Sequence, residues 1–287
     1  MWKPKKVFAR ALDPVHIGAG GYKLGWVDNT IVRDPATNVP KIPGTSIAGV
    51  VKAFAEIVKE EDEEKNESKR VLKDLDIKEL FGTDSKKGAL RFYDGQIIFF
   101  PVSSIQGTVW VTTSELLNYW LEEDWTNEFP DKLEDKVIPL CGIDPTKPLN
   151  LVWLLLKVES SDQEILLPFG VKRAVVVSDK LFPHIVNDNL EVRTSVRIDR
   201  DTGTAVEGAL FTYEAIPRGA ILGFEVCLDR MRNSFSEDTI NKLIKAVEPY
   251  FRNLGIGGMG TRGFGRLEVL LENDGSGSTG GVTDAQS

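Results

Sequence analysis

The residues best suited to chemistry lie in the stretch LDPVHIGAGGYKLGWVDNT, residues 12–30. His16, one of only two histidines, lies among glycines, and Asp28 follows it in a polar Asp28-Asn29-Thr30 cluster. A carboxylate beside a bound phosphodiester can hold Mg²⁺ or another divalent cation, or help to activate an attacking hydroxyl. Taken alone, a single loop aspartate is more often structural or solvated, so the other segments must decide between these interpretations.

The glycine-rich stretch NLGIGGMGTRGFG near the C-terminus is a second candidate site and holds six glycines. Gly255, Gly257 and Gly260 have the spacing of the dinucleotide fingerprint, which follows a strand and opens a helix. This stretch instead follows a predicted helix and leads into the last predicted strand, so we do not expect a Rossmann site. Glycines let backbone amides approach a ligand closely, and Arg262 and Arg266 add positive charge for a phosphate. A flexible loop without a ligand is the alternative.

The start of the first predicted helix, PGTS at residues 43–46, is a third candidate site. Free amides and the positive end of the helix dipole suit a phosphate there, with Lys41 before the helix and Lys52 along it. Thr45 or Ser46 can equally serve as an ordinary N-cap. The pattern therefore leaves anion binding and capping open.

Other kinds of site lack the residues that they need. His16 and His184 have no Cys or carboxylate at metal-ligand spacing, so we expect no structural zinc. A nucleophile elbow is excluded because no G-x-S-x-G occurs. Cys141 and Cys227 lie in apolar stretches and are predicted to be reduced core residues. No apolar run approaches the roughly 20 residues that span a bilayer, and no signal peptide is recognisable, so we expect no membrane contact and a cytoplasmic protein.

The charge of the chain is negative overall but unevenly distributed. A net charge of −8 argues against a nucleic-acid partner for the chain as a whole. Residues 56–67 and 122–135 carry seven acids each, whereas residues 1–58 carry eight Lys or Arg against four acids. Because local potential governs where a polyanion docks, a basic surface remains compatible with nucleic acid. Residue chemistry alone goes no further than a candidate nucleic-acid binder.

The elements that must position these residues alternate between strands and helices. Apolar residues at helical spacing predict one helix after PGTS and another over residues 234–251, where Ser234 and Glu237 fit a capping box. A third helix is expected over residues 114–125, and a strand hairpin should turn at Asp94-Gly95. The two apolar stripes are expected at Ile47, Val50, Val51, Phe54 and Val58, and at Ile240, Leu243, Ile244, Val247 and Phe251. Single strands are expected over residues 5–12, 151–158, 173–177, 220–230 and 266–272.

Residues 191–212 show the clearest strand alternation and predict a β-hairpin. One of its faces is fairly apolar and the other carries Arg193 and Arg197. The whole order of elements is compatible with a ferredoxin-like α+β fold that carries insertions. We expect a single domain over residues 1–272, with a charged insert over about 59–87 and a flexible tail over 273–287.

Several segments together resemble the repeat-associated mysterious protein (RAMP) superfamily of CRISPR effectors, and most closely the backbone subunit of a type III-B, or Cmr, complex. The resemblance covers residues 7–271, and the segments occur in the family's order. They are LDPVHIGAG, GWVDNTIVRDP, KIPGTSIAGVVKAF, GALRFYDGQIIFFPVSSIQGTVWVTT, RTSVRIDRDTGTAVEGALFTYEAIP and GIGGMGTRGFGRL.

The resemblance implies a modified RNA-recognition-like, ferredoxin-type palm with a β-hairpin thumb at residues 191–212. It implies that copies of the chain stack along one CRISPR RNA beside other Cmr or type III subunits. The thumb would displace a nucleotide of the guide–target duplex, and Asp28 would support cleavage of single-stranded target RNA with Mg²⁺ or another divalent cation.

The resemblance also implies a set of RNA contacts, although His16 could equally brace its loop. One alternative is a binding-only scaffold subunit in which Asp28 is structural. A nucleotide-binding enzyme that uses the Gly255–Gly260 loop is an alternative from another class. The residues assigned to RNA are His16, Lys41, Thr45, Ser46, Lys52, Arg193, Arg197, Gly257, Gly258, Met259, Gly260, Thr261, Arg262, Gly263 and Arg266.

Overall fold

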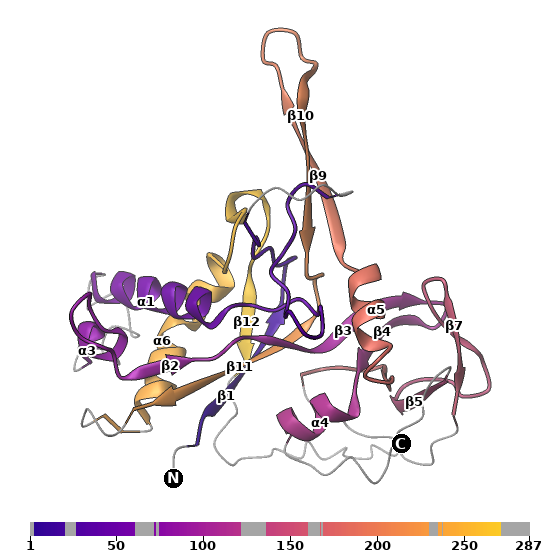
Figure 1. Cartoon of the computed structure of the whole chain (residues 1–287), viewed down its shortest axis with the longest axis horizontal. Coiled ribbons are helices and arrows are strands. Elements are labelled where there is room, and N and C mark those ends of the chain that lie inside the picture. Colours follow the sequence, from indigo (N-terminus) through magenta and orange to yellow (C-terminus); the bar gives the residue numbers. More distant parts are fainter. Residues whose placement is uncertain are drawn as a thin grey trace, which may run out of the picture.

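The computed structural model is a mixed α+β protein in which a large sheet carries a projecting β-hairpin (Figure 1). No helix in the described part of the chain is long and apolar enough to cross a membrane. Both cysteines, Cys141 and Cys227, are buried in the core, as predicted. The structure describes residues 3–20, 27–60, 72, 75–121, 136–159, 167, 169–229, 235–236 and 238–270.

The first half of the sheet is antiparallel and has the strand order β12-β1-β11-β3. Helices α1 and α6 pack on each other, with the ring of Phe54 stacked on Tyr250 at 5.6 Å between centroids. Strands and helices alternate along the chain, and strands that are neighbours in the sheet, such as β1 and β11, come from distant parts of the sequence. The elements of this half are β1 (Lys5–Ala11), α1 (Gly44–Glu60), β2 (Leu90–Phe92), β3 (Gln96–Ser104), β11 (Ile221–Leu228), α6 (Asp238–Asn253) and β12 (Leu267–Leu270).

The apolar stripes predicted for the two long helices form the core between helices and sheet. Every predicted stripe residue of α6 is buried, and in α1 only Val50 is partly exposed. Burial of these stripes removes apolar surface from water, which is what holds an amphipathic helix against a sheet. The capping box predicted at Ser234 and Glu237 lies outside the described residues.

The second half of the sheet is inserted between β3 and β11 and continues the same sheet. Strand β3 joins the halves, because its start pairs with β11 and its end pairs with β4. The prediction of one strand over residues 151–158 is wrong: β6 and β7 form a tight hairpin, with Val152 in the left-handed region at φ 57°. The elements are β4 (Gly107–Thr112), α4 (Ser114–Leu121), β5 (Lys136–Cys141), β6 (Leu149–Leu151), β7 (Leu154–Val158), β8 (Ala174–Val176) and α5 (Phe182–Asp188).

The predicted hairpin turn at Asp94-Gly95 is also wrong. Strands β2 and β3 do not pair with each other, because both run antiparallel to β11. Gly95, between the two strands, instead pairs with Ile42 in the chain that leads into α1. The Ile42 N–H donates to the Gly95 carbonyl oxygen at 2.9 Å, and the Gly95 N–H donates to the Ile42 carbonyl oxygen at 2.7 Å. Pairing with a distant strand thus overrides a local turn signal.

The charged segments of the sequence are described only in part. Helix α3 (Ile77–Phe81) forms near the end of the predicted insert, and Asp76 caps it by accepting from the amides of Lys78 and Glu79. Residues 61–71, the whole acidic segment 122–135 and the tail at 273–287 lie outside the described residues.

The strands predicted over residues 191–212 form the hairpin that projects from the body, drawn in orange in Figure 1. Strands β9 (Glu191–Ile198) and β10 (Ala205–Ala215) are joined by a turn in which Gly203 has φ 65°. The predicted apolar face is not packed on the core, because the hairpin stands away from it. The exposed apolar side chains of the hairpin are Val192 (51%), Val196 (43%), Ile198 (52%), Leu210 (60%) and Phe211 (42%).

Candidate functional site

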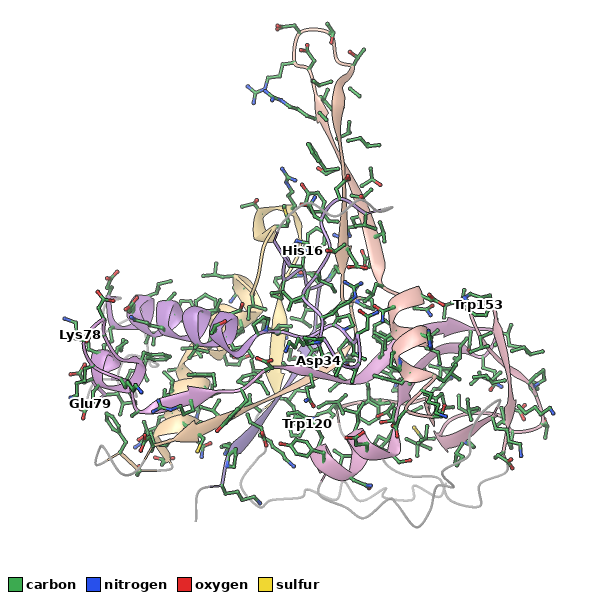
Figure 2. All side chains as sticks on the ribbon, viewed as in Figure 1. His16, Asp34, Lys78, Glu79, Trp120 and Trp153 are labelled. Atoms are coloured by element: carbon green, nitrogen blue, oxygen red, sulfur yellow. The ribbon has the colours of Figure 1, made fainter. Side chains whose placement is uncertain are left out.

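Four segments from the N-terminal part, strand β10 and the C-terminal part of the chain meet at the foot of the β9–β10 hairpin. They are the chain leaving β1, the loop that carries Asp28, the foot of β10 and the glycine-rich loop between α6 and β12. Figure 2 shows His16 below the projecting hairpin, where these segments join. Single backbone bridges connect Val15 with Ile216, Gly18 with Ile31, and Asn29 with Tyr213.

Asp28 is exposed and fastened to strand β10 through one residue, Thr212. Its Oδ2 accepts hydrogen bonds from the Thr212 backbone N–H and from the Thr212 hydroxyl, each at 2.8 Å. The Asp28 backbone N–H donates to the same hydroxyl at 2.9 Å. Within the described residues, the second carboxylate oxygen, Oδ1, accepts no hydrogen bond from the protein. One oxygen of Asp28 therefore anchors the side chain, while the other is available to a ligand.

The Thr212 contacts also keep the Asp28 carboxylate charged. The backbone N–H of Thr212, and then its hydroxyl, lower the pKa of Asp28 below its ordinary value, because hydrogen bonds to a carboxylate favour the ionised form. Asp28 is therefore a carboxylate throughout the neutral range. It can act as a ligand or accept a proton, but it has none to donate.

The donor set at Asp28 fits a divalent cation only as a shared site. No three His, Cys, Asp or Glu side chains converge within the described part of the chain. Mg²⁺ commonly takes one or two carboxylates from the protein and completes its shell with water and substrate phosphates. The one available oxygen of Asp28 fits that pattern, with nucleic acid supplying further ligands.

Glu214 anchors the rest of the Asp28 loop. Its carboxylate accepts from the Ile31 N–H at 3.1 Å and pairs with Arg33 at 2.5 Å, and both charged side chains are largely buried. The Glu214 N–H donates to the Asn29 carbonyl oxygen at 3.0 Å. The loop from Asn29 to Arg33 is thus tied to β10 by both backbone and side-chain contacts.

His16 braces the junction between the β1 exit and the hairpin. Its side chain is 5% exposed, and Nδ1 lies 2.6 Å from the Glu214 carbonyl oxygen. The ring packs edge-on against Tyr213 and Phe264, with centroids 5.8 and 6.4 Å away. The burial favours the bracing role over the RNA contact predicted for this residue.

The glycine-rich loop is closely packed on this junction rather than being a loose connection. A Cβ at Gly257, whose φ is 86°, would lie 2.4 Å from the His16 carbonyl oxygen. At Gly265, with φ 93°, it would lie 2.3 Å from the Ile256 carbonyl oxygen. Close backbone packing and positive φ angles therefore require glycine. As expected from its context, the loop follows a helix and enters a strand, unlike a dinucleotide fingerprint.

The outer rim of the same loop is exposed and carries an arginine without a carboxylate partner in the described structure. The exposed residues of this rim are Gly257, Gly258 and 260–263. Gly260–Arg262 form a single 3₁₀ turn, η1. The Arg262 guanidinium donates to the Tyr213 hydroxyl at 3.1 Å and to the Ser195 hydroxyl at 3.5 Å. Its neutral partners orient the charge without cancelling it.

Arg193 lies at the same junction but has a partly compensated charge. Its guanidinium pairs with Glu191 at 2.5 Å, donates to the Gly263 carbonyl oxygen at 3.3 Å, and lies 4.8 Å from the Phe264 ring centroid. Arg197 is further along β9 and exposed. Arg193 therefore serves mainly to hold the glycine-rich loop against the hairpin.

Arg266 is paired differently from Arg262. Its guanidinium binds both carboxylate oxygens of Asp13, and this contact raises the pKa of Arg266. A phosphate would have to compete with that carboxylate. The predicted phosphate contact is therefore better supported for Arg262 than for Arg266.

The predicted anion site at the start of α1 is filled by the protein itself. Helix α1 begins at Gly44, so Thr45 and Ser46 are inside the helix, and the prediction that they N-cap it is wrong. Asp94 caps it by accepting from the Gly44 N–H at 2.8 Å. Because the Asp94 carboxylate already occupies the Gly44 amide and places a negative charge there, it repels a phosphate from this helix end.

Lys41 is likewise engaged by carboxylates. It pairs with Asp94 at 2.7 Å and with Asp34 at 3.7 Å, and the hydrogen bond to Asp94 is the largest cause that raises the pKa of Lys41. These residues line a cavity of about 550 Å³ to which Glu115 and Asp179 add further acids. Its negative potential opposes a phosphate contact by Lys41, whereas Thr45 is exposed and Lys52 half-buried.

Sequence reasoning missed Thr212, Glu214, Tyr213 and Arg33. Glu214 had a usable signal, because it is an acid in a strand whose neighbours are apolar or aromatic. Thr212 had none, since a threonine is ordinary in a strand and its partner is 184 positions away.

The sequence matches the RAMP superfamily over residues 8–268. It is 28% identical over 291 residues to the CRISPR system Cmr endoribonuclease Cmr4 of Pyrococcus furiosus, which covers 91% of this chain and 93% of that protein. The fold is similar to type III-B Cmr-beta bound to cognate target RNA, with TM-score 0.69, 21% identity and coverage of 93% and 96%. It is also similar to oligomeric Cmr4 from Pyrococcus furiosus, with TM-score 0.63, 23% identity and coverage of 93% and 98%.

Proposed function

Because the chain belongs to the RAMP superfamily, we propose that it is the backbone subunit of a type III-B CRISPR effector complex. In this role, several copies bind one CRISPR RNA along its length, beside other Cmr subunits, and cleave complementary single-stranded RNA at regular intervals. Support comes from a relative named as an endoribonuclease and from a similar chain in a complex with target RNA.

The observation that carries the proposal is the available carboxylate oxygen of Asp28 at the foot of a projecting hairpin. The strand order β12-β1-β11-β3, with both helices in the expected places, supports a ferredoxin-like palm. The hairpin then serves as the thumb. Its exposed apolar side chains suit contact with unstacked bases, because base faces are apolar and stack without regard to sequence.

Guide binding must not depend on the guide's sequence, which favours contacts to phosphate and sugar. Arg262 and the exposed rim of the glycine-rich loop offer such contacts beside Asp28. The single domain over residues 1–272 and the cytoplasmic location remain predictions that accompany this role.

In the proposed reaction, the target ribose 2′-oxygen attacks the adjacent phosphorus and the bond from phosphorus to the 5′-oxygen breaks. The Asp28 Oδ1 accepts the 2′-hydroxyl proton, and the leaving oxygen takes a proton from water. Displacement of a nucleotide by the hairpin aligns the attacking oxygen with the phosphorus, and such alignment accounts for much of the rate. In the alternative use of the same oxygen, Asp28 Oδ1 and RNA phosphates would hold a divalent cation, which would stabilise the phosphate's negative charge.

The assembled complex with its guide RNA provides the direct test of the function. Incubated with a complementary single-stranded RNA and Mg²⁺, it should give products at one regular spacing, and excess EDTA should stop their formation. A non-complementary RNA of equal length is the control and should stay intact. Tight binding of the complementary RNA without any cleavage, in Mg²⁺ or in Mn²⁺, would favour the scaffold-only alternative.

A more specific expectation concerns the two arginines of the glycine-rich loop. Arg262→Gln should weaken guide RNA binding for every guide sequence and reduce the slope of log affinity against log salt by about one, because one phosphate contact is lost. Arg266→Gln is the matched control, and its effect should be smaller because Asp13 already holds that guanidinium. Filter binding across a salt series measures both. Equal losses, or a loss confined to certain guide sequences, would contradict the difference that we assign.

A further inference from the structure

Asp28 has one side-chain partner in the described structure, Thr212 on strand β10. We propose that Thr212 is a positioning residue, which fixes the Asp28 carboxylate to the hairpin so that the place of the hairpin on RNA sets the orientation of the reacting oxygen. This inference rests on the proposed function, because it assigns to Thr212 a role in that same cleavage.

The contacts between the two residues leave little freedom to the carboxylate. The Thr212 hydroxyl donates its one proton to Asp28 Oδ2 and accepts from the Asp28 N–H, while the Thr212 N–H adds a second bond to Oδ2. All three distances lie between 2.8 and 2.9 Å. An exposed aspartate without such bonds samples several rotamers, and immobilising it beforehand avoids that entropy cost in the reaction.

The backbone next to Asp28 is held by the same residue. The Thr212 carbonyl oxygen accepts from the Asn29 N–H at 3.0 Å and from the Asn29 side-chain amide at 3.3 Å. Asn29 in turn forms a parallel bridge with Tyr213. The segment that follows Asp28 thus runs parallel to β10 at this point and is fastened to it by one β-bridge and by the bonds to Thr212.

The two residues of β10 that directly precede Thr212 are exposed to solvent. Leu210 and Phe211 are 60% and 42% exposed, and Thr212 follows them directly. RNA that displaces or bends the hairpin at these side chains therefore acts on the Asp28 anchor one or two residues away. Because Thr212 holds the Asp28 carboxylate on the hairpin, a nucleotide displaced by the hairpin should lie at a constant distance and orientation from that carboxylate.

The test compares three variants in the assembled complex with guide RNA, using a complementary single-stranded RNA under single-turnover conditions. Thr212→Val keeps the shape and strand propensity but removes the hydroxyl. We expect its maximal cleavage rate to fall about tenfold to a hundredfold, the size of effect that small misplacements of a reacting group produce, with target affinity unchanged. Thr212→Ser keeps the hydroxyl and should restore most of the rate.

Thr108→Val is the matched control, because Thr108 is an exposed strand threonine on β4, outside the hairpin junction. It should cleave at the wild-type rate, and melting curves should show that all three variants fold. A wild-type rate for Thr212→Val, or equal losses in the Val and Ser variants, would overturn the positioning role and leave the proposed function in place. Undiminished cleavage by Asp28→Asn, measured in parallel, would instead refute the catalytic assignment and this inference with it.

Discussion

Replacing Asp28 by asparagine should reduce target RNA cleavage by roughly 10²–10⁴-fold, the range that positioned acid–base groups contribute. Asparagine keeps the size of the side chain and can still accept from Thr212 through its carbonyl oxygen. The NH₂ group that replaces the second oxygen is neutral and donates hydrogen bonds. It can neither accept the 2′-hydroxyl proton nor ligate a cation. Single-turnover cleavage by the assembled complex measures the loss.

Binding should survive the same substitution, because Asp28 contributes no positive charge toward RNA. Asp84→Asn is a suitable control, since Asp84 is an exposed turn residue outside the hairpin junction. It should change neither cleavage nor binding. If Asp28→Asn bound target RNA tightly and still cleaved it at the usual spacing, Asp28 would be a structural residue and the catalytic centre would lie elsewhere.

The second large effect is expected at Glu214, whose carboxylate is the anchor for Arg33. The side chains of Glu214 and Arg33 are only 11% and 19% exposed, so Glu214→Gln leaves a largely buried guanidinium without its counter-charge. Breaking a buried ion pair costs about 3–5 kcal/mol, and residual exposure of this pair reduces that to about 2 kcal/mol. Urea denaturation of the purified chain should show this fall in the free energy of unfolding.

Glu191→Gln is the matched control for that experiment, since Glu191 also pairs with an arginine at the foot of the hairpin. The Glu191–Arg193 pair is more exposed, at 29% and 41%, and pairs of this kind contribute about 0.2–1 kcal/mol. The Glu214 variant should also cleave more slowly, because the loop from Asn29 to Arg33 loses its side-chain anchor. Equal falls in the free energy of unfolding for the two substitutions would show that the more buried Glu214–Arg33 pair stabilises the fold no more than the exposed pair.

Local spacing in the sequence was sufficient for the elements whose patterns repeat over several turns or strand positions. The stripes of α1 and α6, and the alternation in residues 191–212, predicted two helices and a hairpin that the structure contains. Signals of one or two residues were less reliable. The Asp94-Gly95 dipeptide predicted a turn, but β2 and β3 both pair with β11, and Asp94 caps α1 instead.

The candidate site divides in the same way. Residue types and their spacing were enough to identify the groups with suitable chemistry, namely a loop carboxylate at Asp28 and a glycine-rich loop with arginines. Their partners became visible only in the folded chain: Thr212 for Asp28, Asp13 for Arg266, and Asp94 for Lys41. Side-chain chemistry and helical or strand periodicity are local properties that a sequence displays directly. Which charges are neutralised and which oxygen stays available depends on contacts between residues far apart in the chain, and these form only when the sheet brings them together.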